Sequence, residues 1–460
     1  MSNIFIWYFI LSFLTVVTSL IFWIKHRQNF WKRQGIYQIN PDFFFGNLKG
    51  IFFQKKALGE TFLDIYKEIK TKDGKHGGLY VFLAPYYMPV DPAIIKQITV
   101  KDFNYFMNHG TYFDEKNDPL SGVLFNIEGH RWRTLRANLT PTFTSGKIKN
   151  MYKIVLDCTE NLAELLLKTI STEQKRPIDI KDIISRYSID IIGNCAFGFF
   201  LNMVKNTVTY RERTQYFRPD FMHLLLQLKN LGKVTDEKTI LASNESQHKP
   251  LLTLNELAAQ CFIFFFAGFE TSATTITFAL FELARNQGIQ EKLRTEIHTI
   301  WETYGNSYET LMKMTYLEKV ICETLRKYPP VPCTNRIANA TYKIPNSKLT
   351  LNKGTNVVIP ILGIHMDPEY YPEPTKFDPE RFSEEAKALR PGCTWLPFGE
   401  GPRSCIGSRF GLLESKIAVA TIIHNFYISL SDSTKLPLEM DPGTLINSSK
   451  GKIWLNIQKV

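Results

Sequence analysis

The sequence lacks the patterns that identify disulfide-linked, zinc-binding and nucleic-acid-binding proteins. Its seven cysteines are odd in number and scattered, and no two of them form a CxxC pair. This spacing argues against a disulfide framework and against structural zinc. Zinc-finger spacing and RNA-binding aromatic signatures do not occur, so nucleic acid is the weakest of the partners that a net charge of +11 could attract. An anionic membrane, an acidic protein partner and a basic surface without a specific partner stay open.

Internal repeats and low-complexity segments are also missing, which excludes repeat and fibrous architectures. Hydrophobic residues make up 44% and charged residues 22%, a balance that indicates a folded chain rather than a disordered one. The 34 phenylalanines favour apolar pockets or membrane contact. At 460 residues the chain could form two or three domains, but one large helix-rich domain with a little sheet is the simplest interpretation.

The first 27 residues predict a membrane anchor. Residues Ile4 to Ile24 carry no charged side chain, and as a helix they would be about 30 Å long, the thickness of the hydrocarbon core. Basic residues follow at once, which favours a cytoplasmic position for the rest of the chain. A cleaved signal peptide is the alternative, but the basic start and the small-residue cleavage site are missing. We expect no second segment of this kind.

Apolar periodicity places the main elements of the body. We expect an irregular stretch to about Gly50, followed by a mainly helical middle with short strands. The expected helices are residues 148–170, 251–285, 288–304 and 315–327, and the expected strands are 78–83, 357–361 and 452–457.

One cysteine has unusual neighbours. In FGEGPRSCIG, residues 398–407, the glycines and the proline predict a tight loop, and a helical apolar pattern follows Cys405. A helix N-terminus stabilises a thiolate. Gly407 would let a flat ligand approach, Arg403 could bind an anionic group, and Phe398 could shield the sulfur from water. The alternative is a structural cysteine in a glycine-rich turn.

Three further motifs have ordinary explanations when each is taken alone. Glu323 and Arg326 share one helix face, which is common for surface ion pairs. Glu270 and Thr271 put an acid beside a hydroxyl, a plausible proton relay, although small residues packing a helix would also explain AGFETS, residues 267–272. Trp132 and Arg136, in HRWRTLR, lie four residues apart on the same helix face, and each would also be explained as an ordinary amphipathic or solvated residue.

Together these motifs resemble the cytochrome P450 family. FGEGPRSCIG looks like its haem-ligand loop, ETLRKYPPVP contains its ExxR, PERF (residues 379–382) follows in the expected order, AGFETS resembles its oxygen-activation helix, and HRWRTLR resembles its WxxxR. The resemblance extends over nearly the whole chain and is closest to insect-type microsomal enzymes. It implies a mainly α fold with small β-sheets, preceded by one N-terminal transmembrane helix. The implied organisation is an anchor at residues 1–27, a linker at 28–50 and a catalytic domain at 51–460.

The resemblance also assigns roles to residues. Cys405 is implied as the axial ligand of the iron of heme b, with Phe398 and Gly407 beside it. Trp132, Arg136 and Arg403 are implied to hold the haem propionates, with Arg336 as a further partner. Thr271 and Glu270 are implied to handle protons. Glu323, Arg326 and Arg381 are implied to form a buried network below the haem. Helix geometry makes most of the five phenylalanines between residues 262 and 269 core residues, because one helix cannot direct five rings into one pocket, and one or two of them are expected to line a lipophilic cavity. Phe125, Val331 and Pro332 are similar pocket candidates.

The implied activity is a haem-thiolate monooxygenase of the endoplasmic reticulum membrane, with the catalytic domain on the cytoplasmic face. Its substrates would be lipophilic: xenobiotics such as plant toxins or insecticides, or endogenous hormones and lipids. Electrons would come from an NADPH–cytochrome P450 reductase on the cysteine side, with cytochrome b5 as a further partner, membrane lipid as a contact and no nucleic acid. An isomerase or peroxide-using enzyme is an alternative class.

One interval departs from the family. CAFG ends at Gly198 and the oxygen motif begins at Ala267, only 69 residues later, so a few tens of residues that normally roof the substrate pocket are missing. The residues implied to hold the haem lie outside this interval. A non-catalytic or impaired haem-binding product is therefore a second alternative.

Overall fold

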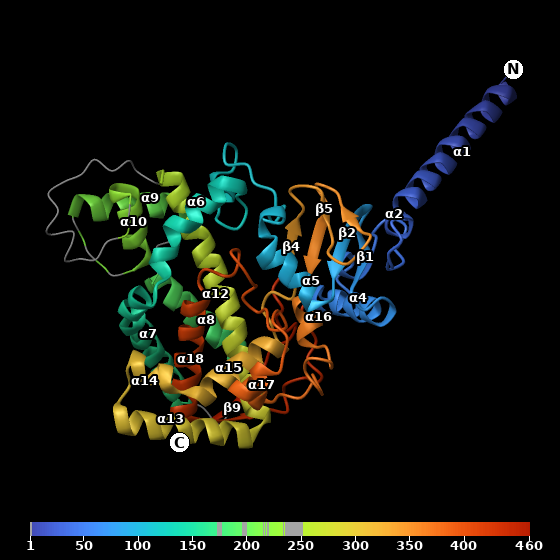
Figure 1. Ribbon diagram of the computed structural model, residues 1–460. Coiled ribbons are helices and arrows are strands. Elements are labelled where there is room, and N and C mark those ends of the chain that lie inside the picture. The colour runs from blue at the N-terminus through green and yellow to red at the C-terminus, as the bar shows by residue number, and fades with distance from the viewer. Residues whose placement is uncertain are drawn as a thin grey trace.

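The computed structural model describes residues 2–172, 177–195, 200–214, 216, 218, 220–232, 234 and 252–460. A large helical body carries a small sheet at one side, and α1 (Ser2–Arg27) projects away from the sheet side (Figure 1). The mainly α architecture with small sheets that we expected is confirmed.

The helices near the four-stranded sheet, and those that join it to the helical body, are mostly shorter than the helices of the body. They are α2 (Phe30–Arg33), α3 (Lys49–Phe52), α4 (Leu58–Lys72), α5 (Pro92–Lys96), α6 (Gly129–Leu139), α16 (Ile361–His365) and α17 (Glu384–Ala388). The helices of the body are α7 (Ser145–Thr172), α8 (Ile180–Cys195), α9 (Phe200–Thr214), α10 (Phe221–Leu231), α12 (Leu254–Arg285), α13 (Gln287–Tyr304), α14 (Tyr308–Lys313), α15 (Thr315–Lys327) and α18 (Ser408–Asn425).

Three sheets accompany these helices. The largest has the order β1 (His76–Val81), β2 (Ala84–Pro89), β7 (Asn356–Ile359), β4 (Thr334–Ile337). Its β1–β2 and β7–β4 pairs are antiparallel and its β2–β7 pair is parallel, so chain segments more than 250 residues apart meet in one sheet. The others are β3 (Ile178–Asp179), β9 (Trp454–Lys459), β8 (Phe426–Leu430), and the pair β5 (Tyr342–Lys343), β6 (Thr350–Leu351).

Helix α12 is the central element of the body. Thr253 and Glu256 form a capping box at its start: the Thr253 hydroxyl accepts from Glu256 N at 3.2 Å, and a Glu256 oxygen accepts from Thr253 N at 2.9 Å. Its second half, Ser272–Ala284, is buried in the larger of two hydrophobic cores together with α7, α8, α15 and α18. The second core lies between the four-stranded sheet, α4 and α16. The site described below lies where these parts meet.

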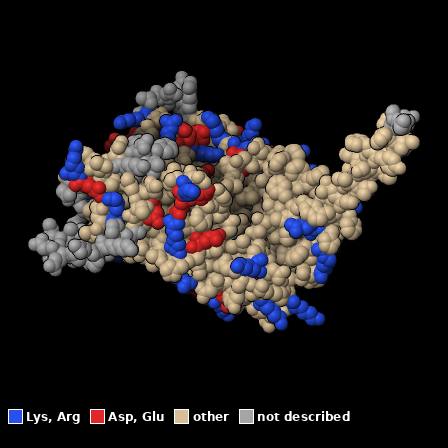
Figure 2. All heavy atoms as spheres, turned by 90° about the horizontal axis from the view of Figure 1, so that it is seen from above, with Lys and Arg blue, Asp and Glu red and all other residues tan. Residues whose placement is uncertain are grey.

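The expected helices correspond to α7, α12, α13 and α15, and the expected strands to β1, β7 and β9. Among the described residues, two helices are long and apolar enough to cross a membrane: α1, whose most apolar window is not buried in the body, and α12, whose window is 50% buried. We expected one such segment, and the burial of α12 identifies it as a core helix. The view from above shows α1 without charged side chains along its outer length (Figure 2).

Part of residues 28–50, the stretch that we expected to be a linker, packs against the sheet. The Trp31 side chain is only 1% exposed, and the Tyr37 carbonyl accepts from Gly78 N of β1 at 2.8 Å. A Cβ on Gly78 would lie 2.1 Å from the Trp31 ring, so glycine is required at this crossing.

Candidate active site

A cavity of about 400 Å³ lies between α12, α6, β4 and the loop before α18. Seven of the nine residues predicted to act on protons or on the cofactor line it: Trp132, Arg136, Thr271, Arg336, Phe398, Arg403 and Cys405. The remaining lining is predominantly apolar, including Leu124, Ile263, Phe264 and Leu325, so the cavity fits a large apolar ligand with a few anionic groups. Of the pocket candidates, Phe125 and Val331 also line it.

The loop before α18 holds Cys405 toward the cavity. Cys405 N donates to Phe398 O at 2.8 Å, which closes the loop. Gly401 has a φ of +78° and passes so close to the backbone of Thr99 that a Cβ there would lie 2.0 Å from the Thr99 oxygen. Only glycine fits this position. The cysteine side chain is exposed to the cavity rather than packed in the core.

Opposing effects act on the pKa of the Cys405 thiol. Burial raises the pKa of the Cys405 thiol, while the backbone N–H of Gly407 and the charge of Arg136 act to lower it. Gly407 is the N-cap of α18, so the predicted helix N-terminus is present, although Gly407 does not line the cavity in the described part of the chain. A thiolate at neutral pH therefore requires a further positive charge at the sulfur, and a metal ion supplies one.

Three arginines surround the cavity, and none forms an ion pair with a carboxylate among the described residues. Arg336 is 1% exposed, and its Nε has no hydrogen-bond partner in this part of the chain. Burial lowers the pKa of Arg336 to about 10, and burial together with the charge of Arg336 lowers the pKa of Arg403 to about 9. Burial also lowers the pKa of Arg136. Uncompensated positive charge at an apolar cavity fits a ligand that brings its own carboxylates.

Arg403 also has a structural role, which could not be predicted from the sequence. Its guanidinium donates four hydrogen bonds to backbone carbonyls of the segment before α6, those of Met107 at 2.9 Å, Leu124 at 3.1 Å, Phe125 at 3.2 Å and Ile127 at 2.7 Å. It also lies over the Trp132 ring, 4.1 Å from its centroid. Few of its N–H groups stay available for a ligand, so Arg403 mainly holds the cavity wall in place.

Thr271 and Glu270 occupy different environments on α12. The Thr271 hydroxyl donates to Ala267 O at 2.6 Å and lines the cavity, so its lone pairs can accept from a group in the cavity. The Glu270 side chain is half-buried and lies outside the cavity lining within the described residues.

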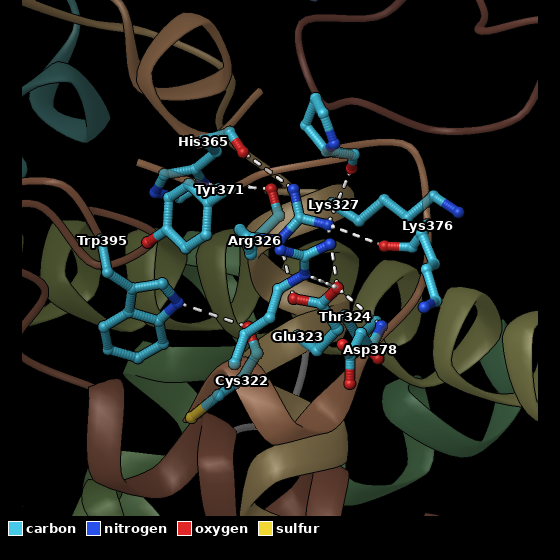
Figure 3. Close-up of polar contacts among 12 residues, drawn as sticks. Cys322, Glu323, Thr324, Arg326, Lys327, His365, Tyr371, Lys376, Asp378 and Trp395 are labelled. Atoms are coloured by element: carbon cyan, nitrogen blue, oxygen red, sulfur yellow. Dashed lines mark hydrogen bonds and ion pairs between the residues drawn. The ribbon is translucent and has the colours of Figure 1, made fainter. Parts of the chain in front are cut away.

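Glu323 and Arg326 form a fully buried pair at the base of the site (Figure 3). Arg326 donates to the two Glu323 oxygens at 2.7 and 2.9 Å and to His365 O at 2.8 Å. Arg381 is a looser member, with its Nε 3.5 Å from a Glu323 oxygen. Burial lowers the pKa of His365 to about 3, and its neutral Nε2 accepts from Leu396 N at 2.7 Å, at the start of the cysteine loop. The network thus braces the loop that carries Cys405.

Sequence reasoning missed two residues at or near the cavity. His109 stacks on Phe125 with ring centroids 4.1 Å apart, and its Nδ1 lies 2.9 Å from Arg336 Nη1. Glu414 of α18 is fully buried, close to Ser188 of α8 and Ser272 of α12. No local pattern in the sequence indicates either residue, because each depends on segments that only folding brings together.

Comparison with known proteins decides the family. The cytochrome P450 family model matches residues 41–233 and 218–455. The chain is 38% identical to a probable cytochrome P450 6a23 of Drosophila melanogaster, over 97% of this chain and 98% of that protein. It is 37% identical to cytochrome P450 6A1 of Musca domestica, over 98% of each.

This chain belongs to the cytochrome P450 family. The predicted fold and the predicted class of enzyme, a monooxygenase, are confirmed, and the alternative of a non-catalytic haem-binding product is not favoured. Membership implies a haem cofactor and electrons supplied by a reductase. The residues present fit that cofactor: an apolar cavity, a cysteine sulfur open to it and arginines without carboxylate partners.

The comparisons also bear on the shortened interval. The match to the Drosophila relative extends over 502 aligned positions, whereas 97% of 460 residues is about 446, so about 56 aligned positions have no residue in this P450. The two parts of the family match meet at residues 218–233, inside the interval 198–267. Gly198 itself lies outside the described residues.

Proposed function

We propose that this monooxygenase binds heme b in the cavity, with Cys405 as the axial ligand of the iron. Trp132, Arg136 and Arg336 would face the propionates, Arg403 would contribute one N–H at most, and Phe398 would cover the sulfur. When bound, the haem supplies oxygen activation, which thiolate ligation favours. The observation that supports this assignment is the sulfur open to an apolar cavity whose arginines have no carboxylate partner among the described residues.

The residues on α12 would handle the protons of the reaction. The Thr271 hydroxyl, tied to Ala267 O, can accept a hydrogen bond from the cavity side and hold a water there. Glu270 lies next to it on the same helix and outside the cavity lining described here. We therefore assign Glu270 the supply of protons from outside and Thr271 their positioning.

The substrates would be lipophilic, because apolar side chains line most of the cavity. Xenobiotics such as plant toxins or insecticides fit this chemistry, as do endogenous hormones and lipids. Helix α1 would anchor residues 1–27 in the endoplasmic reticulum membrane as a single span, with the catalytic domain, residues 51–460, on the cytoplasmic face. NADPH–cytochrome P450 reductase would dock on the cysteine side, where basic residues would attract its acidic surface, and cytochrome b5 is proposed as a further partner.

The reduced carbon-monoxide spectrum tests the ligand assignment. We expect the full chain to show the red-shifted Soret band of a thiolate-ligated haem, and Cys405→Ser to lose it, because an alcohol does not supply the thiolate. Cys333→Ser is the matched control, since Cys333 lies outside the cavity lining, and it should keep the band. A red-shifted band in Cys405→Ser would contradict the assignment.

Product formation that requires NADPH and reductase would separate the monooxygenase from an isomerase or a peroxide-using enzyme. We expect oxidation of a lipophilic substrate panel only when both are present.

A further inference from the structure

One wall of the cavity is formed by a segment without regular secondary structure. We call residues 122–127 the wall segment; all of them are described, and they belong to no helix or strand. Its Leu124 and Phe125 side chains line the cavity together with Phe264 and Thr271 of α12. Because no helix or sheet hydrogen bonds hold this segment, its position depends on side chains from other parts of the chain.

A buried glutamine of α12 binds two backbone groups of the wall segment. Leu124 N donates to Gln260 Oε1 at 2.8 Å, and Gln260 Nε2 donates to Gly122 O at 3.0 Å. Nε2 also donates to Glu256 O, one turn earlier in α12, at 3.2 Å, which fixes the orientation of the amide within its own helix. The Gln260 side chain is fully buried. One amide therefore pairs a donor and an acceptor of the wall segment at the same time.

Other elements bind the rest of the wall segment. The Arg403 guanidinium of the cysteine loop donates to three of its backbone carbonyls, as described above. Phe125 stacks on His109, whose Nδ1 lies 2.8 Å from Asn335 O of β4. The wall segment is thus held between the cysteine loop, β4 and α12, and Gln260 provides a buried contact on the α12 side.

The exposed contacts between this region and α12 are weaker. Arg131 of α6 forms ion pairs with Glu115 and with Glu256 in the first turn of α12, but its side chain is 47% exposed. Exposed ion pairs contribute little, because water screens them and two long side chains must be ordered. Gln260 is different, because a buried backbone group that loses its partner costs more free energy than the hydrogen bond itself provides.

We propose that Gln260 is a positioning residue for substrate selection. It holds the wall segment at a fixed separation from α12, and this separation decides how large a ring fits between Phe125 and the face of α12 that carries Thr271. Gln260 itself lies outside the cavity lining within the described residues, so it acts through Leu124 and Phe125. The inference rests on the lipophilic substrates proposed above and adds a residue that determines their fit.

Binding of two nitrogen ligands to the haem-loaded full chain tests this proposal. Imidazole is small, whereas 4-phenylimidazole adds a ring that the cavity lining must accommodate, so the ratio of their Kd values reports on the lining. Both ligands are titrated by the shift of the Soret band, which needs neither reductase nor turnover. Gln260→Met keeps the length of the side chain and removes both hydrogen bonds to the wall segment. We expect it to weaken 4-phenylimidazole relative to imidazole by about three- to tenfold, the effect of one misplaced aromatic contact.

Gln290→Met is the matched control. Gln290 is also buried and also pairs with two backbone groups, since its Nε2 donates to Ile428 O at 2.8 Å and its Oε1 accepts from Ile428 N at 3.1 Å. It lies outside the cavity lining, so the variant should lower the thermal unfolding midpoint and leave the ratio of Kd values unchanged. An equal change of the ratio in both Met variants would mean a general loss of stability, and the proposal would be wrong.

A double variant separates the position of the wall segment from other effects of Gln260. Phe125→Ala should itself weaken 4-phenylimidazole relative to imidazole, and Gln260→Met added to it should change the ratio little further, because both remove the same contact. A full additional change in the double variant would contradict the proposal. Gln260→Glu keeps the acceptor for Leu124 N, so it is the milder variant, and it should shift the ratio in the same direction by a smaller factor.

The reduced carbon-monoxide spectrum distinguishes failure of this inference from failure of the proposed function. A thiolate-type band in the wild type, together with an unchanged ratio in Gln260→Met and Gln260→Glu, would overturn the role of Gln260 and leave the haem assignment standing. A wild type without this band would overturn the haem assignment, and the role of Gln260 with it.

Discussion

Single residues around the cavity carry charge states that burial sets. Arg336 and Arg403 are buried and Arg136 is half-buried, none of them with a carboxylate partner among the described residues, and burial lowers their pKa values. The carboxyl of Glu414 is buried with no cationic partner in the same part of the chain, and burial raises its pKa. The three arginines favour an anionic ligand. The carboxyl of Glu414 keeps a proton close to α12, the helix that carries Thr271.

Thr271 is the residue whose chemistry can be tested most directly. We expect Thr271→Ala to lower the product formed per NADPH consumed by about tenfold or more, because positioned proton transfer contributes at least this much. Thr271→Ser should restore most of the yield, since it keeps the hydroxyl. Thr274→Ala is the matched control, because Thr274 is buried on the same helix outside the cavity lining. Unchanged coupling in Thr271→Ala would remove Thr271 from the proton path.

Glu414 predicts a pH dependence of stability. Burial raises its pKa to about 8, against an ordinary value of 4.5, although the Ser188 and Ser272 hydroxyls oppose the shift. The folded state therefore keeps a proton that the unfolded state loses as the pH rises from 4.5, so this group favours folding at low pH and opposes it increasingly up to about pH 8.

Glu414→Gln should remove this dependence. Between pH 5 and pH 8 the wild type should lose stability relative to the variant, on the order of 2–4 kcal/mol. Thermal unfolding midpoints of both proteins at the two pH values check the prediction. Parallel pH profiles would show that Glu414 is ionised in the folded state.

At the scale of elements, α15 and the cysteine loop are coupled through a buried ion pair. Helix α15 presents Glu323 and Arg326 on one face, and Arg326 reaches carbonyls beyond its own helix, including those of His365 and Pro374. His365 then accepts from the loop that carries Cys405. The planar guanidinium of Arg326 connects these elements through the directions of its N–H groups as well as through its charge.

Removal of the Arg326 side chain should therefore strongly lower the stability of the protein. We expect Arg326→Ala to cost about 3–5 kcal/mol, because it strands the buried Glu323 carboxylate, and to lower haem content. Arg326→Lys should rescue little, since an ammonium cannot bind both Glu323 oxygens and the two carbonyls. Lys292→Ala, which breaks an exposed pair with Glu380, is the control and should cost at most about 1 kcal/mol. Equal haem content in the Ala variants of Arg326 and Lys292 would contradict this role.

At the scale of the whole molecule, several apolar side chains at and near the cavity are exposed. Phe262 and Phe266 of α12 are 42% and 51% exposed, and Phe125 and Val331 are 46% and 37% exposed. Phe125, Phe266 and Val331 also line the cavity. Water therefore reaches the site more easily than it would in a site that is closed on all sides.

Because water can reach the cavity, we expect only part of the NADPH consumed to lead to oxidised product. We expect this P450 to release more hydrogen peroxide per NADPH consumed than the Musca domestica relative, measured side by side with the same reductase and substrate, because water exclusion suppresses side reactions. A peroxide yield equal to that of the relative would show that the cavity closes in solution.

The sequence by itself determined the local features: the anchor, the helical body and the motifs around residues 132, 271, 323 and 405. Each of these features depends on residues within a few positions of one another. The signals are apolar periodicity, turns that require glycine, and residues three or four positions apart that share one face of a helix. Tertiary structure alone decided the rest, because the contacts join distant segments. Arg403 binds carbonyls almost 300 positions away, Glu414 is removed from water between three helices, and Trp31 is buried against the sheet. Burial sets the pKa of a side chain, and burial is a property of the fold rather than of the local sequence.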